Sequence, residues 1–134
     1  MKQQTGDTLL VKSFGKKNNI YIPDVGDIGW LEFDNPPIGR EQGYHRRAII
    51  VSAMVYNRIT SKAIAFPIST RVKGYRFEVP LPEGLDSRGV ILSDDIKSVD
   101  WKAREFKFIE KAPEDVVLEV LARVKALIPL LDNS

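Results

Sequence analysis

Cysteine is absent from the 134-residue sequence, and histidine occurs once, at His45. A chain without cysteine forms no disulfide and no thiolate metal site, and a single histidine excludes a multi-histidine metal site. No apolar run approaches the ~20 residues that cross a bilayer, and the first residues lack the apolar segment of an export signal. We therefore expect a soluble, cytoplasmic protein without a metal or other cofactor.

Charge is unevenly distributed along the chain. The segment from Arg40 to Arg76 carries eight basic residues and one acidic residue, Glu41, which gives it a charge of +7. Since the whole chain carries +2, the remainder carries −5. A basic middle in a nearly neutral protein favours a local anionic partner such as a phosphate backbone or an acidic peptide, although a solvated face of a small barrel would look the same.

The composition, with 43% apolar and 28% charged residues, is that of one globular domain. Residues 1–19 are mostly polar and predict a poorly ordered N-terminal arm. From residue 20 onward, short apolar segments alternate with turns rich in glycine and proline, which indicates a small antiparallel barrel or sandwich. The expected strands are 28–33, 47–53, 63–68, 77–81, 90–92 and 96–100, with a loop or single helical turn at 56–61.

The C-terminal segment has a different pattern. Pro113, Glu114 and Asp115 are suited to a first helical turn, and Pro129 is suited to the end of the helix. Apolar residues recur between them at helical spacing and predict an amphipathic helix that packs on the barrel. They are Val117, Val120, Leu121, Val124, Leu127, Ile128 and Leu131.

Glycine-rich nucleotide motifs and nucleophile elbows are absent, so the candidate chemistry rests on other polar side chains. Glu41 and Arg46 lie just before the expected strand 47–53, and Ser69 and Thr70 follow the expected strand 63–68. If the two segments lie side by side, a carboxylate, a guanidinium and hydroxyls converge in a way that suits metal-free RNA cleavage. Each residue also has an ordinary structural interpretation, such as a rim salt bridge or a turn. Trp30 and Trp101 are interpreted as structural, although Trp101, beside Lys102 and Arg104, could instead stack on a base. Alternation along the strand favours Arg46 inside the site and His45 at its margin.

Several segments, taken in order, resemble the MazF (PemK-like) toxins of bacterial toxin-antitoxin modules. The resemblance runs from about Tyr21 to the C-terminus and leaves only the arm uncovered. It rests on Pro23-Asp24-Val25-Gly26-Asp27-Ile28, Trp30, Glu32-Phe33-Asp34, Gly39-Arg40-Glu41-Gln42, Arg46, Tyr56-Asn57, Pro67-Ile68-Ser69-Thr70, Lys73-Gly74-Tyr75, Phe77-Glu78-Val79 and residues 94–104.

The resemblance implies that residues 20–134 form an SH3-like barrel of the CcdB/PemK type, mainly β with a C-terminal helix, that works as a homodimer. The implied activity is sequence-specific, metal-independent endoribonuclease cleavage of single-stranded mRNA, leaving 2′,3′-cyclic phosphate and 5′-hydroxyl ends. The implied partner is a MazE-like antitoxin whose acidic segment lies along a groove of the dimer and blocks it.

Carried onto this sequence, the resemblance makes Glu41 the acidic catalytic position and Arg46 the catalytic arginine. Ser69 stands where the family usually has threonine, and Thr70 is the alternative hydroxyl. Arg47 replaces a proline, and Asp95 replaces a glutamine that helps to read RNA, so a different base preference is expected. The predicted RNA-binding residues are Arg40, Gln42, His45, Arg47, Asn57, Arg71, Lys73, Asp95 and Arg104.

Two other hypotheses stay open. A gyrase-inhibiting toxin on the same barrel would act by binding a protein, and would inhibit DNA supercoiling while leaving RNA intact. A barrel weakened in catalysis, suggested by Ser69 and Asp95, would bind RNA or a peptide in a salt-sensitive manner without cutting it.

Overall fold

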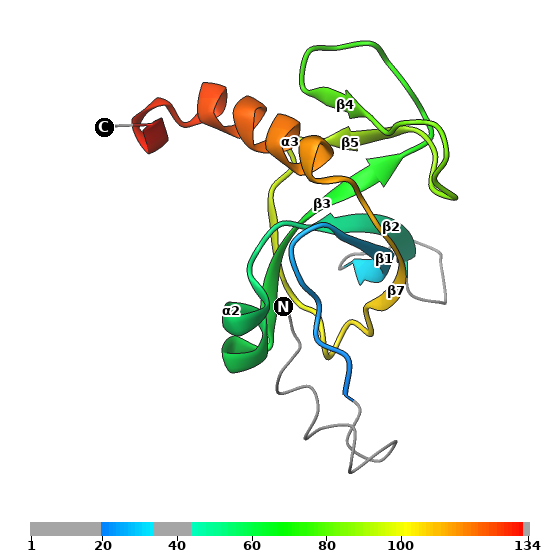
Figure 1. Cartoon of the computed structure of the whole chain (residues 1–134), viewed down its shortest axis with the longest axis vertical. Coiled ribbons are helices and arrows are strands. Elements are labelled where there is room, and N and C mark those ends of the chain that lie inside the picture. The colour runs from blue at the N-terminus through cyan, green and yellow to red at the C-terminus, as the bar shows by residue number, and fades with distance from the viewer. Residues whose placement is uncertain (1–19, 34–43, 133–134) are drawn as a thin grey trace.

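The computed structural model describes residues 20–33 and 44–132 (Figure 1). The predictions for the arm at 1–19 and for Arg40, Glu41 and Gln42 lie outside these ranges. None of the described helices has the length and apolar content needed to span a bilayer. The elements are β1 (Asp27–Phe33), β2 (Tyr44–Ile50), α2 (Met54–Thr60), β3 (Lys62–Ser69), β4 (Glu78–Pro80), β5 (Val90–Leu92), β6 (Lys97–Asp100), β7 (Lys107–Lys111), α3 (Glu114–Leu127) and the 3-10 helix η2 (Pro129–Asp132).

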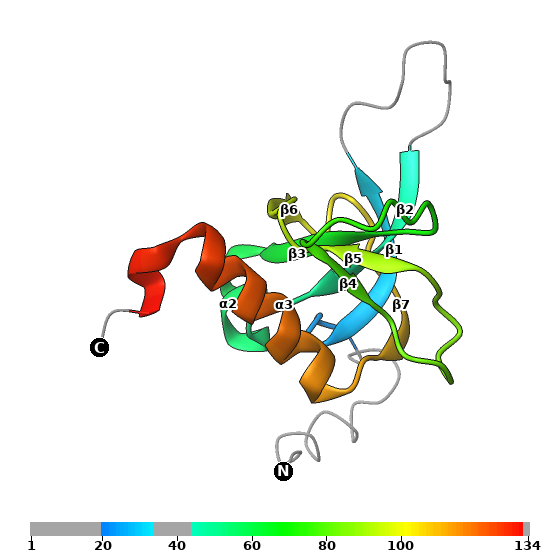
Figure 2. The same cartoon turned by 90° about the horizontal axis from the view of Figure 1, so that it is seen from above.

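The strands form one bent antiparallel sheet in the order β4-β5-β3-β2-β1-β7, and β6 pairs with the first half of β3. Figure 2 shows the bend from above. The end strands β4 and β7 do not pair with each other in the described part of the chain, so the sheet curls without closing. The predicted mainly β fold with a C-terminal helix is confirmed, as an open form of the barrel.

Pro67 lies inside β3, although proline has no backbone N–H to donate to a sheet. On one side β3 pairs with β2, including Ala48 opposite Pro67. On its other side β6 pairs up to Ala65, and β5 pairs from Ile68 onward. The proline therefore falls in the gap between β6 and β5, where no ladder bond needs its missing N–H.

Alternation along the strands builds an apolar core on each face of the sheet. One core joins Ile28, Ile49 and Phe66 to Val120 of α3. The other joins residues of β1, β2 and β3 to Trp101, which is 8% exposed. This placement confirms the structural interpretation of Trp101.

Helix α3 begins after Pro113 and ends before Pro129, as predicted, and buries Val116, Val117, Val120 and Val124. Its C-terminal half runs out past the strands (Figures 1 and 2). The prediction that the whole apolar stripe packs on the barrel is therefore wrong for its last turns. The exposed members of the stripe are Leu121, Leu127, Ile128 and Leu131.

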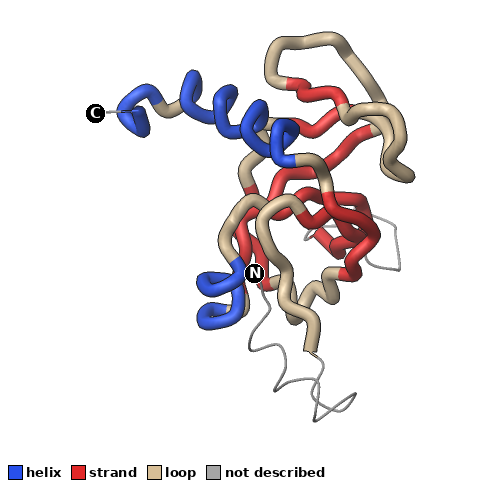
Figure 3. Tube along the Cα trace, viewed as in Figure 1, coloured by secondary structure: helices blue, strands red, loops and turns tan. Residues whose placement is uncertain are grey.

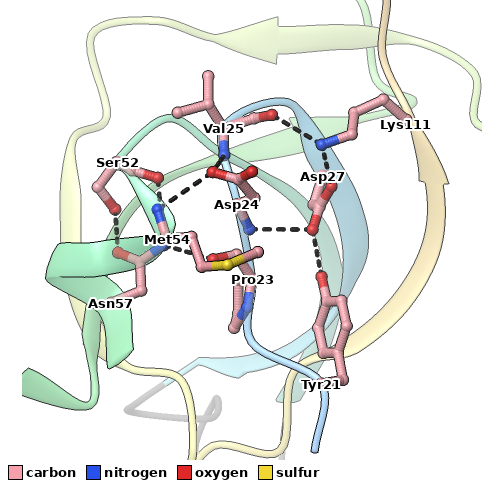
Figure 4. Close-up of polar contacts among 9 residues, drawn as sticks. All are labelled: Tyr21, Pro23, Asp24, Val25, Asp27, Ser52, Met54, Asn57 and Lys111. Atoms are coloured by element: carbon pink, nitrogen blue, oxygen red, sulfur yellow. Dashed lines mark hydrogen bonds and ion pairs between the residues drawn. The ribbon is translucent and has the colours of Figure 1, made fainter. Parts of the chain in front are cut away.

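A polar cluster ties the segment before β1 to the rest of the fold (Figure 4). The buried Asp27 carboxylate accepts hydrogen bonds from the Tyr21 hydroxyl and from the Asp24 backbone N–H, 3.0 Å away. Lys111 of β7 pairs with the same carboxylate at 2.7 Å. Burial and the bond to Asp27 raise the pKa of Tyr21, so this hydroxyl stays protonated. The cluster joins the chain entering β1 to the strand β7 beside it.

Asn57 is the centre of a second set of bonds and has no exposed surface. Its Nδ2 donates to the carbonyls of Pro23, at 2.8 Å, and Ser52, at 3.1 Å. Its Oδ1 accepts the Ser52 hydroxyl at 2.6 Å, and its backbone carbonyl accepts Trp101 Nε1 at 2.8 Å. The segment is helix α2, seven residues long where the sequence suggested a loop or one turn (Figure 3). Figure 4 shows Asn57 on this helix with its bonds to Ser52 and Pro23.

Replacing Asn57 with alanine is expected to lower the free energy of unfolding by about 3 kcal/mol, because buried carbonyl and hydroxyl groups lose their partners. Thermal unfolding of Asn57→Ala against Arg58→Ala, the exposed neighbour, measures this. The Arg58 variant should lie within about 0.5 kcal/mol of the wild type. A wild-type midpoint for Asn57→Ala would contradict the central role of this side chain.

Candidate functional site

A cavity of about 690 Å³ opens where the end of β3 meets β1 and β2. The turn at 86–88, between β4 and β5, also contributes to its lining. The lining residues are Trp30, Arg46, Arg47, Ile68, Ser69, Thr70, Arg71, Asp86 and Arg88.

Strand register brings two of the predicted catalytic residues to this cavity. Ala48 of β2 lies opposite Pro67 of β3, and Arg46 and Ser69 each lie two residues beyond this pair on their strands. Both line the cavity, together with Thr70. The two segments that the sequence analysis required to lie side by side therefore form one site.

Arg46, Ser69 and Thr70 supply two kinds of hydrogen-bond donor to the cavity, a guanidinium and hydroxyls. The Arg46 guanidinium carbon lies 6.0 Å from the centre of the Phe33 ring. The Ser69 hydroxyl oxygen accepts the backbone N–H of Arg71 at 3.0 Å, which leaves its hydrogen to be donated to a ligand. Thr70 is exposed beside it. A guanidinium and two hydroxyls are thus present in the lining of one cavity.

The cavity is cationic, with four arginines and one aspartate in its lining. The basic loop from Thr70 to Arg76 continues from the cavity along the chain. It is held by Glu78, which is 7% exposed. The Glu78 carboxylate accepts the backbone N–H groups of Lys73 at 3.0 Å and Gly74 at 2.7 Å. Within the described residues, no group of three or more His, Cys, Asp or Glu side chains is placed to hold a metal ion.

Five of the predicted RNA-binding residues do not line the cavity. His45 is exposed on β2, Lys73 is exposed on the basic loop, and Arg104 is half-buried after β6. Asp95 pairs with Lys97 at 3.3 Å, which offsets its negative charge. Asn57 is fully buried with its amide occupied, so the prediction that it contacts RNA does not fit its position, and we leave it out of the site.

Besides the core residue Ile68, sequence reasoning missed three residues of the lining. Trp30, interpreted as structural, is 42% exposed and faces the cavity. Asp86 and Arg88 belong to a turn with no motif of its own, and they reach the site because the turn folds back beside β3. The alternation Ile28-Gly29-Trp30 was the available signal for Trp30, whereas no sequence pattern placed the turn.

The fold and the site together define a small SH3-like β protein with a cationic cavity. Residues 24–128 match the family model of the PemK-like, MazF-like toxin of type II toxin-antitoxin systems. The endoribonuclease toxin MazF of Escherichia coli K12 is 42% identical over 109 residues, covering 81% of this chain and 96% of that protein.

Solved structures agree with the sequence match. MazF in a MazE-MazF crystal structure (Form-II) from Deinococcus radiodurans has a TM-score of 0.77 and 40% identity, covering 83% of this chain and 99% of that chain. MazF alone from the same organism (Form-I) has a TM-score of 0.74 and 41% identity, with 82% and 99% covered. The chain belongs to the family of PemK-like, MazF-like toxins of type II toxin-antitoxin systems.

Proposed function

We propose that this protein is the toxin of a type II toxin-antitoxin module and a sequence-specific endoribonuclease that cuts single-stranded mRNA without a metal ion. The observation that carries the proposal is the meeting of Arg46, Ser69 and Thr70 in one cationic cavity, in a chain that is 42% identical to a protein named endoribonuclease toxin MazF. The cytoplasm, where mRNA is translated, is the proposed place of action.

The proposed chemistry uses the RNA's own 2′-hydroxyl as the nucleophile. Glu41, the acidic position implied by the family resemblance, accepts the proton of the 2′-hydroxyl while the 2′-oxygen bonds to phosphorus. The bond from phosphorus to the 5′-oxygen breaks, and that oxygen takes up a proton. Arg46 and the hydroxyl of Ser69 or Thr70 donate to the phosphate oxygens as negative charge accumulates on them. The products are a 2′,3′-cyclic phosphate and a 5′-hydroxyl.

The proposed protein partners follow from the same surface. A MazE-like antitoxin with an acidic segment would compete with RNA for the four arginines of the cavity. The homodimer stays a prediction, and the apolar side chains left exposed at the end of α3 and on η2 are a surface that a second copy can cover.

Incubation of the purified protein with a long mixed-sequence RNA in EDTA tests the function. Discrete cuts with cyclic phosphate ends are expected, and a substrate with 2′-deoxyribose at the cut position should resist. Uncut RNA with salt-sensitive binding would indicate the weakened barrel instead, and inhibition of supercoiling with intact RNA would indicate a gyrase inhibitor.

The variants Ser69→Ala and Thr70→Ala test which of the two hydroxyls donates to the phosphate. We expect Ser69→Ala to lower kcat by about a hundredfold, because it removes a donor to the developing charge. Thr70→Ala should change kcat by no more than about threefold. Single-turnover cleavage of one mapped site measures both rates, and Ser69→Thr is expected to retain cutting. If Thr70→Ala proves the damaging change, Thr70 supplies the catalytic hydroxyl.

A further inference from the structure

A chain of hydrogen bonds outside the cavity links β7, the turn at 86–88 and β2. The Glu110 carboxylate of β7 accepts the backbone N–H groups of Asp86, at 2.9 Å, and Ser87, at 2.8 Å. The Ser87 hydroxyl, on a side chain that is 1% exposed, accepts Arg47 Nη1 at 2.9 Å. A single carboxylate thus holds the turn and, through Ser87, an arginine of the site.

Arg47 is held from a second side by Trp30. The two residues are opposite each other across β1 and β2, and the guanidinium carbon lies 5.1 Å from the Trp30 ring centre. Stacking on one face and a bond at the tip restrict a long side chain before any ligand arrives. An arginine ordered in advance loses less conformational entropy when it binds a phosphate.

The electrostatics of Glu110 agree with this arrangement. Burial alone would raise the pKa of its carboxyl, but the bonds from the Ser87 side chain and from the Asp86 and Ser87 backbone, with the charge of Arg47, bring the pKa below its ordinary value. The ionised form is therefore the one that the turn and Arg47 favour.

The same turn carries other parts of the site. Arg88 lines the cavity, and the backbone at Gly89 lies against the end of β3, so close that a side chain there would come within 2.1 Å of the Ser69 carbonyl oxygen. Movement of residues 86–87 would therefore shift Arg88 and press on Ser69.

We propose that Glu110, acting through Ser87, is a positioning residue that orders Arg47 and Arg88 as a phosphate-binding wall for the RNA on either side of the cut. The inference rests on the proposed function. Glu110 itself lies outside the cavity lining and touches no RNA.

The direction in which one substitution changes the affinity for RNA distinguishes a positioning role from an effect of net charge. Glu110→Gln removes a negative charge, and charge alone would tighten binding to a polyanion. A positioning role predicts the opposite, since the amide nitrogen of glutamine faces a backbone N–H and no longer attracts Arg47. We expect KM for RNA to rise about tenfold with kcat within about twofold of the wild type. Glu83→Gln, an exposed glutamate on the same connection, is the matched charge control and should bind as tightly as the wild type or tighter.

Binding is also measured with an all-2′-deoxy copy of the substrate, by fluorescence anisotropy, so that it does not depend on cleavage. Glu110→Gln should weaken Kd about tenfold in the wild type and have no further effect in Arg47→Ala, because the two residues act as one unit. Glu110→Asp, which keeps the charge, should recover part of the loss. Binding by Glu110→Gln equal to that of Glu83→Gln, or an undiminished effect in Arg47→Ala, would overturn the inference. Failure of the wild type to cut RNA would overturn the proposed function and leave this binding test valid.

Discussion

The Arg46→Ala variant is expected to cut RNA about a thousandfold more slowly than the wild type, because a guanidinium is the group that best matches the charge spreading over the phosphate oxygens. The loss should appear in kcat more than in KM, since the stabilising contact strengthens as the transition state forms. Cleavage of one mapped site under single-turnover conditions measures it.

The fold should survive this change. Arg46 is half-buried at a strand end, and its ring contact with Phe33 contributes no more than about 1 kcal/mol. The matched control is Arg71→Ala, an exposed arginine of the same cavity, which should raise KM and reduce the salt dependence of binding with kcat largely kept. Cutting at the wild-type rate by Arg46→Ala, with an unchanged unfolding midpoint, would remove Arg46 from the mechanism.

Local patterns were enough to place the centre of the site. Short apolar segments indicated strands near β2 and β3, and the polar residues at their ends were predicted to form one site if the two segments lie side by side. Arg46 and Ser69 do line the same cavity. Pro113 and the acidic residues after it fixed the start of α3 within a residue. These features are encoded by neighbours along the chain, so a single sequence is sufficient to read them.

Features that depend on distant segments were missed. Strand β7, Lys107–Lys111, is only five residues long and has no apolar alternation, so it is recognisable as a strand only through its pairing with β1. Asn57 is polar and was interpreted as a ligand contact, yet Pro23 and Ser52 bond its amide, Trp101 bonds its backbone carbonyl, and the residue is buried. Glu110 and Ser87, far apart in sequence, acquire a joint role only when β7 and the turn meet.

The turn at 86–89 can be tested against the cleavage site directly, because two of the chain's glycines form a matched pair. Gly89 and Gly84 both adopt positive φ, +108° and +101°. A Cβ atom at Gly84 meets nothing within 4 Å, whereas one at Gly89 would lie 2.1 Å from the Ser69 carbonyl oxygen and 3.0 Å from the Thr70 Cα. Gly84→Ala thus adds only backbone strain, and Gly89→Ala adds strain and a collision with the strand end that carries the hydroxyls.

We expect Gly84→Ala to cost about 1 kcal/mol of stability and to cut RNA normally. Gly89→Ala should cost about 3 kcal/mol, because backbone atoms must move to admit the methyl group. Its kcat, measured at a temperature where both variants are folded, should fall about a hundredfold, since a shift of about 1 Å at Ser69 separates the hydroxyl from the phosphate that Arg46 holds. If Gly89→Ala folds and cuts like Gly84→Ala, the turn does not set the position of Ser69, and the hydroxyl that serves the phosphate must be placed by β3 alone.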